Sequence, residues 1–131
     1  MRQGFTQQLH LGITPISQVV IPKKSRSHLV ALLAALQYIY THQEWNQKIS
    51  RLMYEHLQKG KKQTGRPGMS LWELFVLAQV RLCMNTSYDE LHHLANYDNL
   101  LRGILGVCPS DYTLGVQYEY QQIYDNVRLL D

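Results

Sequence analysis

A short pattern recurs three times along the chain and constrains the fold more than any other feature: a Ser or Thr followed three residues later by Glu. The three copies are Thr41 with Glu44, Ser70 with Glu73, and Ser87 with Glu90. In such a capping box each side chain accepts a hydrogen bond from the other residue's backbone N–H, a group that the first turn of a helix leaves unpaired. The pattern therefore predicts three helix starts, at about residues 42, 71 and 88.

The spacing of apolar residues extends this prediction to a chain built of helices. Leucines and a tyrosine at intervals of three and four predict a first helix over about 28–40, and a second over about 42–59 has Trp45, Ile49, Leu52, Met53 and His56 on one side. The helix from 71 is apolar almost all round, which predicts that it is the central, most buried helix. A further helix is capped by Asp98 and stops at Gly106, and a last amphipathic helix runs from 116 to 130.

These elements predict an all-α fold: a small helical domain with a helix-turn-helix-like tri-helical unit, preceded by a helix pair and an extended N-terminal arm. Pro15 and Pro22 prevent a long helix in the arm. The expected parts are the arm (1–27), the helix pair (28–60), a basic Gly/Pro linker (61–69), and the tri-helical unit with the C-terminal helix (70–131). We expect 28–131 to form one compact domain, since 131 residues suit a single core.

The basic residues are candidates for contact with nucleic acid. Thirteen Lys and Arg against ten Asp and Glu permit such binding without requiring it. The distribution of the cations along the chain is therefore the better indicator of a nucleic-acid site. They gather in two clusters, Lys23, Lys24 and Arg26 in the arm, and Lys59, Lys61, Lys62 and Arg66 in the linker. The tripeptide 65–67, Gly-Arg-Pro, resembles the core of an AT-hook, which lays its arginine in the minor groove. The alternative is a solvated linker whose Gly and Pro only break the helix.

The last helix is a second candidate for reading DNA. Gln117, Gln121 and Arg128 are expected on its exposed side, with amides suited to adenine and a guanidinium suited to guanine or phosphate. Tyr118 and Tyr124 are expected to stack or to touch the backbone. The alternative is that these are ordinary surface and half-buried residues. The helix from 88 is less suited, because it begins with Asp89 and Glu90.

Several classes of function lack support in the sequence. There is no catalytic motif, so we expect no catalytic residue and no cofactor. His92 and His93 project about 100° apart on a helix, so they are interpreted as an exposed polar pair rather than a metal site, and no metal is expected. Cys83 and Cys108 are interpreted as idle thiols.

With neither a signal peptide nor an apolar stretch of spanning length, we expect a cytoplasmic protein that does not bind a membrane.

The run TGRPGMSLWELFVLAQVRLCMNTSYDELHHLANYDNLLRGILGV resembles the N-terminal domain of insertion-sequence transposases of the DDE type. The resemblance rests on 65–69 (GRPGM), Arg81-Leu82, Tyr88-Asp89 with Leu91, Leu94-Ala95-Asn96, and Leu101-Arg102 followed by Leu105-Gly106. It continues upstream in LGITPISQVVIPKKSR and downstream in YEYQQIYDNVRLLD, and so covers essentially the whole chain.

The resemblance implies a function in binding the terminal inverted repeats of the element, in a prokaryotic cytoplasm and at the nucleoid. The implied partners are double-stranded DNA and either a second copy or the full-length transposase. In that family a later, ribonuclease-H-like domain carries three carboxylates that hold two metal ions, and nothing here matches it, so no catalytic role is carried over to Asp89, Asp111 or Asp125. The last helix has no stop signal, which predicts a chain cut within a longer protein, and the alternative is a frayed natural terminus. The alternatives are an oligomerisation module, formed by the apolar stripe of the last helix and the helix from 71, and a truncated transposase that regulates transposition.

Overall fold

Six α-helices and two short 3-10 turns make up most of the part of the chain that the computed structural model describes, namely residues 5, 7, 14–58, 69–107 and 118–130. In chain order they are η1 (Ile16–Gln18), α1 (His28–Thr41), α2 (Gln43–Gln58), α3 (Leu71–Met84), α4 (Tyr88–Tyr97), α5 (Asn99–Leu105), α6 (Tyr120–Val127) and η2 (Arg128–Leu130). No strand occurs in these ranges, and the all-α prediction is confirmed. Within the same ranges no helix is both long and apolar enough to cross a bilayer.

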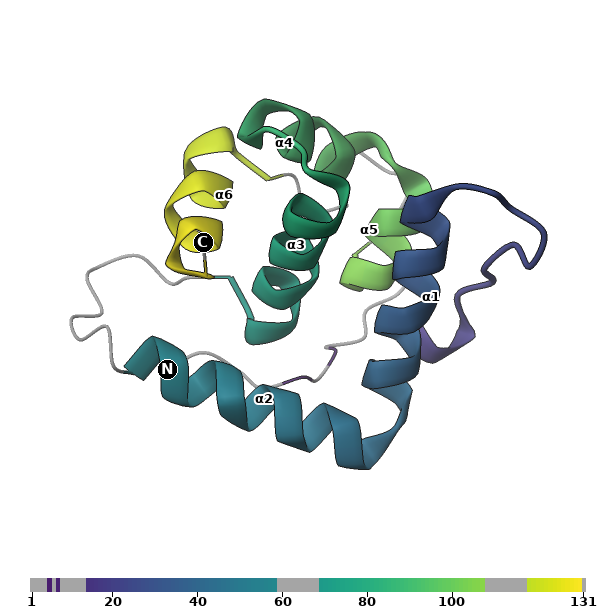
Figure 1. The fold of residues 1–131 in the computed structure, drawn as a ribbon, viewed down its shortest axis with the longest axis horizontal. Helices are drawn as coiled ribbons and strands as arrows, with labels where there is room; N and C mark the ends of the chain where they lie inside the picture. The colour runs from purple at the N-terminus through teal and green to yellow at the C-terminus, as the bar shows by residue number, and fades with distance from the viewer. Residues whose placement is uncertain (1–4, 6, 8–13, 59–68, 108–117, 131) are drawn as a thin grey trace.

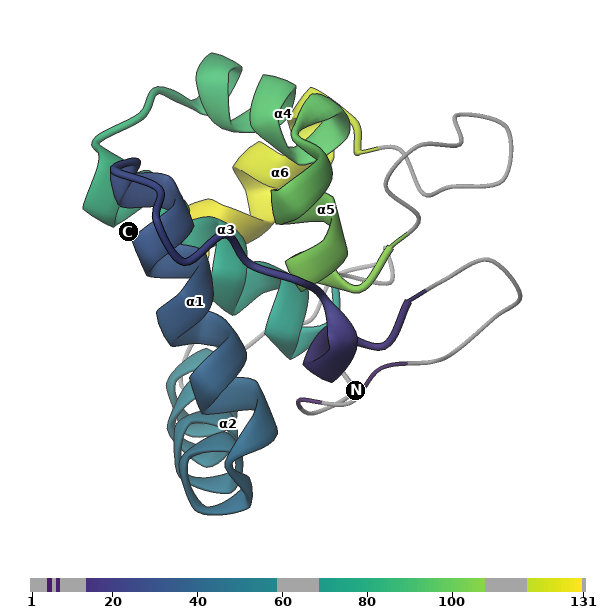
Figure 2. The same cartoon turned by 90° about the vertical axis from the view of Figure 1, so that its right-hand side faces the viewer.

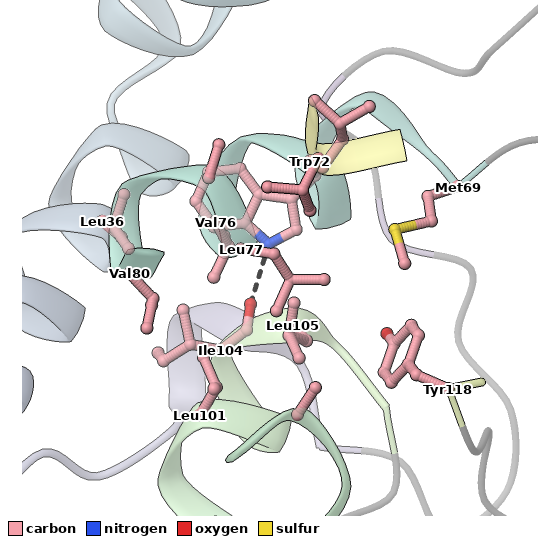
Figure 3. Close-up of a cluster of buried hydrophobic side chains, with 14 of the residues drawn as sticks. Leu36, Met69, Trp72, Val76, Leu77, Val80, Leu101, Ile104, Leu105 and Tyr118 are labelled. Carbon is pink, nitrogen blue, oxygen red and sulfur yellow. Dashed lines mark hydrogen bonds between the residues drawn. The ribbon is translucent and has the colours of Figure 1, made fainter. Parts of the chain in front are cut away.

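Helix α3 is the centre of the fold, as its apolar composition predicts. The other helices surround it, with α1 and α5 on one side, α6 on the opposite side and α2 across one end (Figures 1 and 2). Seven of its side chains are buried, and the largest, Trp72, donates its indole N–H to the carbonyl oxygen of Ile104 in α5 at 2.7 Å (Figure 3). The last turn differs from the prediction, because Leu82 is 55% exposed.

The starts of α3, α4 and α5 and the end of α5 are set by the local signals in the sequence. Ser70 and Glu73 form the complete capping box. The Ser87 hydroxyl accepts the backbone N–H of Glu90 at 3.1 Å, and the Asp98 carboxylate accepts that of Leu101 at 2.9 Å, which fixes the starts of α4 and α5. Gly106 closes α5 with φ +87°, a left-handed conformation that costs glycine little.

The capping box predicted at Thr41 is wrong. Thr41 is the last residue of α1, and its hydroxyl donates backward to the carbonyl oxygens of Gln37 at 3.0 Å and Tyr38 at 3.2 Å. Only His42, in an extended conformation, separates α1 from α2, and its carbonyl oxygen accepts the N–H of Asn46. As the last residue of α1, Thr41 does not have the extended backbone conformation from which an N-cap oxygen reaches the N–H groups of the next helix.

The buried side of α2 also differs from the prediction. Ile49, Met53 and Leu57 face α1 and α3, whereas Trp45 is 46% and Leu52 is 58% exposed. Both sets follow helical spacing, so periodicity alone selects neither. The neighbouring helices select the stripe through Met53, and this leaves the second stripe in solvent.

The N-terminal arm contributes to the core rather than standing apart from it. Phe5 packs edge-on against Trp72 with ring centroids 5.1 Å apart, and Ile16 is 1% exposed. Gln37 donates to the carbonyl oxygens of Ile16 and Val19 at 2.9 and 2.8 Å, which fastens η1 to α1. Gly103 allows the close approach of the arm to α5, since a Cβ there would lie 3.3 Å from the methyl groups of Val19.

Helix α6 begins at Tyr120, later than the predicted 116, and its α-helical part ends at Val127. The start has a physical cause, because the Asn96 side chain bonds both the backbone N–H and the carbonyl oxygen of Tyr118. Backbone groups engaged in this way cannot enter a helix. Val116 lies outside the described residues, while Ile123 and Val127 from the predicted stripe are buried.

Candidate nucleic-acid interface

The three predicted cations of the arm lie together on the surface. Lys23, Lys24 and Arg26 are all exposed, in the segment that leads from Pro22 to the start of α1. Ser27 occupies the N-cap position of α1 in an extended conformation, but its side chain makes no capping hydrogen bond. The positive end of the α1 dipole therefore adds to the charge of these three side chains.

Formal charge is segregated along the chain. The first 43 residues contain four cations, Arg2 and the three above, and no Asp or Glu, whereas residues 44–131 contain nine cations and ten acids. The first stretch thus carries +4 and the rest −1. Segment 23–26 is consequently an exposed basic site whose sequence neighbours supply no carboxylate to neutralise it.

The predicted reading face of α6 is exposed but mixed in charge. Gln121 donates its amide N–H to the Asp125 carboxylate at 2.9 Å, and the Arg128 guanidinium lies over the ring of Tyr124 at 5.3 Å. Glu119 is also exposed at the start of this helix. The Asp125 carboxylate lies three residues before Arg128 and Glu119 adds a negative charge at the other end of the helix, so this face is electrostatically weaker than segment 23–26.

The structure does not bring the arm cluster and the α6 face together. Segment 14–27 lies beside α1 and α5, and α6 lies on the other side of α3 (Figures 1 and 2). The linker cations Lys59, Lys61, Lys62 and Arg66 lie outside the described residues, as does Gln117.

A cluster of three tyrosines flanked by two arginines joins α3, α4 and α6, and the sequence reasoning missed it as a unit. The Arg81 guanidinium lies 4.2 Å from the centre of the Tyr88 ring, and Tyr88 packs edge-on against Tyr124 with centroids 5.0 Å apart. Tyr124 is stacked on Tyr120 along α6 and is covered by Arg128. Cation–π and aromatic contacts of this kind hold α6 in orientation against α4.

Tyr118 is buried, which corrects the prediction that it stacks on DNA. It is 2% exposed and its hydroxyl donates to the Glu73 carboxylate in α3. Its backbone N–H donates to the Asn96 Oδ1 atom at 2.7 Å, and its carbonyl oxygen accepts from Asn96 Nδ2 and from His92 Nε2, both at 2.9 Å. One residue thus fastens the chain before α6 to two other helices.

The same contacts correct the view of His92 and His93 as an exposed pair. His93 is exposed, but His92 is half-buried and its Nε2 atom faces the Tyr118 carbonyl oxygen. Since a carbonyl oxygen only accepts, Nε2 carries the proton. Within the described ranges no three His, Cys, Asp or Glu side chains gather in a way that would hold a metal ion.

Burial and the neighbouring carboxylate change the acidity of Tyr118. Loss of hydration raises the pKa of its phenol well above the ordinary 10.0, and the negative charge of Glu73 raises it further. The opposing effect of Arg102, which is itself buried and donates to the Ala95 carbonyl oxygen at 2.9 Å, is smaller. Tyr118 therefore stays protonated and donates to Glu73 at neutral pH.

No family model, no curated protein and no solved structure matches this chain.

Proposed function

We propose that the chain binds double-stranded DNA and that segment 23–26 contacts the phosphate backbone. The observation that carries the proposal is the exposure of Lys23, Lys24 and Arg26 beside the N-terminal end of α1, within 43 residues that contain no carboxylate side chain. Each cation that neutralises a phosphate releases condensed counterions, so such a segment binds tightly at low salt and weakly at high salt. Backbone N–H groups at the start of a helix favour phosphate as well.

The resemblance to DDE transposases supports a more particular proposal, that the DNA is the terminal inverted repeat of an insertion sequence. Strand transfer would belong to a separate catalytic domain. The connection of α3 to α4 through only Asn85–Ser87 is typical of a helix-turn-helix unit. In that unit α4 would enter the major groove, but its first turn exposes Asp89 and Glu90. We therefore assign affinity to segment 23–26 and to the linker cations, and sequence preference to Arg66 and to Gln121 and Arg128 of α6.

Salt-dependent DNA binding tests the assignment of segment 23–26. Fluorescence anisotropy would follow the binding of a labelled terminal-repeat duplex and of a scrambled duplex at several NaCl concentrations. Replacing Lys23, Lys24 and Arg26 by Ala should weaken binding to both duplexes and lower the slope of log affinity against log salt by about 2.7, at about 0.9 per phosphate contact. A slope equal to that of the wild type would refute the assignment.

The matched control replaces Lys48 and Arg51 by Ala, two exposed cations of α2 that lie among Glu44 and Glu55. Their removal should leave the slope unchanged. If the wild type binds neither duplex even at low salt, the whole proposal of DNA binding is wrong.

Two further variants separate affinity from sequence preference. Replacing Lys61 and Lys62 by Ala should weaken binding to both duplexes and flatten the salt dependence, as expected for backbone contacts. Replacing Gln121 and Arg128 by Ala should reduce affinity only for the terminal repeat, by about 1–3 kcal/mol for a lost base contact. An equal loss of affinity for both duplexes would show that α6 contacts the DNA backbone and does not read its sequence.

A further inference from the structure

Helix α2 has an apolar strip on its solvent side in addition to its buried side. Trp45 and Leu52 lie seven residues apart, on one stripe of the helix, and are 46% and 58% exposed. Leu129 of η2 is 46% exposed as well, and its backbone carbonyl oxygen lies 3.4 Å from His56 Nε2, which places η2 beside the C-terminal end of α2. We call Trp45 and Leu52 the α2 strip. In Figure 1, α2 runs along the outer edge of the described fold with no other helix beyond it.

The α2 strip differs from an isolated exposed apolar residue, because its side chains line up on one face of the helix. Large apolar side chains that line up on one face are typical of surfaces that pack against another protein. The Lys48 ammonium lies 5.7 Å from the centre of the Trp45 ring and is the contact that partly covers it. The buried stripe of the same helix already fills the core through Ile49 and Met53, so rotation of α2 cannot bury both.

Charged residues beside the strip indicate what would cover it. Glu44 precedes Trp45 and Arg51 precedes Leu52, and both charged side chains are exposed. When two α2 helices pack antiparallel about a two-fold axis near residue 48, each Trp45 lies against Leu52 of the second copy. The same operation places each Glu44 opposite Arg51 of the second copy, so this ion pair occurs twice, while the two Lys48 side chains at the axis have to turn toward solvent.

We propose that the α2 strip is a self-association surface, on which a second copy of this chain packs through an antiparallel α2 helix. A helix of 16 residues is about 24 Å long, so the contact lies at the low end of specific interfaces, which bury about 1,000 Å² or more. Self-association should therefore depend on protein concentration.

Sedimentation velocity over a concentration series on the order of 1–300 μM tests the proposal. The wild type should shift from monomer to dimer, and Leu52→Glu should weaken the dimer by about tenfold or more, because it buries a charge in the contact. Leu82→Glu is the matched control, since Leu82 is 55% exposed on α3, away from the strip, and it should dimerise like the wild type. Circular dichroism of both variants establishes that the helices are retained.

Charge reversal tests the antiparallel arrangement. Glu44→Arg alone places two arginines together and Arg51→Glu alone places two glutamates together, so each variant should dimerise about tenfold more weakly than the wild type. Mixed in equal amounts, the two variants restore both ion pairs and should form a heterodimer with near wild-type affinity. A wild type that stays monomeric throughout the series, an equal loss in Leu52→Glu and Leu82→Glu, or a mixture that stays monomeric would each overturn the proposal.

Discussion

The hydrogen bond from Tyr118 to Glu73 gives the most direct test of how α6 is held. The substitution Tyr118→Phe removes the hydroxyl and keeps the buried ring, so it creates no cavity of the size of an aromatic side chain. It leaves one oxygen of the Glu73 carboxylate without its donor, while the other oxygen still accepts from the backbone N–H and the hydroxyl of Ser70.

The expected loss follows from the charge on the acceptor. A hydrogen bond to an ionised group contributes about 1.5–3 kcal/mol net, and the partner left behind here, Glu73, is half-buried. With an unfolding entropy of about 2.1 cal/mol/K per residue, 131 residues give about 0.28 kcal/mol/K, so a loss of about 2 kcal/mol lowers the Tm by about 7 °C.

Urea denaturation at pH 7, followed by far-ultraviolet circular dichroism, measures this change. Tyr120→Phe is the control, because it makes the same chemical change on a ring that is 39% exposed, and it should alter stability by less than about 0.5 kcal/mol. A double-mutant cycle with Glu73→Gln isolates the coupling between the two residues. If Tyr118→Phe is as stable as its control, the bond makes no net contribution and the reasoning fails.

Three further predictions concern the same core. Ser70→Ala removes the capping box of α3 and should cost about 1 kcal/mol in the free energy of unfolding, whereas Ala at the exposed Ser17 should cost much less in the same denaturation assay. Gly106→Ala forces an L side chain to φ +87° and toward Ile16, 3.3 Å away, and should lower stability by at least about 1 kcal/mol; an unchanged midpoint would show that this turn relaxes. Because the folded-state pKa of Tyr118 is raised, the unfolded chain loses this proton first. Stability from this group is therefore complete below about pH 10 and falls as pH rises beyond it, and a pH 9–12 series should show a smaller alkaline loss in Tyr118→Phe.

Local signals in the sequence were sufficient to predict the starts of α3, α4 and α5 and the end of α5, but not the start of α6. Ser70, Ser87, Asp98 and Gly106 act on backbone groups within four residues of themselves, so their effect does not depend on the rest of the fold. Thr41 shows the limit of such signals. It fits the capping pattern of α2, but it is the last residue of α1 and its hydroxyl bonds a carbonyl oxygen of that helix.

The face of α2 and the position of Tyr118 depend on contacts far apart in the sequence. Which stripe of α2 is buried follows from α1 and α3, and both stripes satisfy helical spacing. Tyr118 bonds Asn96 over 22 residues and Glu73 over 45, and no periodicity marks a tyrosine for such a place.

The cationic candidates were predicted from charge and the glutamines from the chemistry of their amides, and for the described residues among them the structure adds exposure and separation. The three arm cations form one exposed cluster that the net charge of +3 conceals, since acids elsewhere in the chain offset it. That α6 lies across the fold from this cluster could not be read from spacing along the chain (Figure 2).

The place of the N-terminal arm in the core has a consequence for synthesis on the ribosome. Gln7 donates to the carbonyl oxygen of Gly106 at 3.2 Å, across 99 residues, and Phe5 packs against Trp72, which is 67 residues later in the sequence. At about 5–20 residues per second, Gly106 emerges about 5–20 s after Gln7. During that interval the apolar side chains of Phe5 and Ile16 lack the part of their core that α3 and α5 supply.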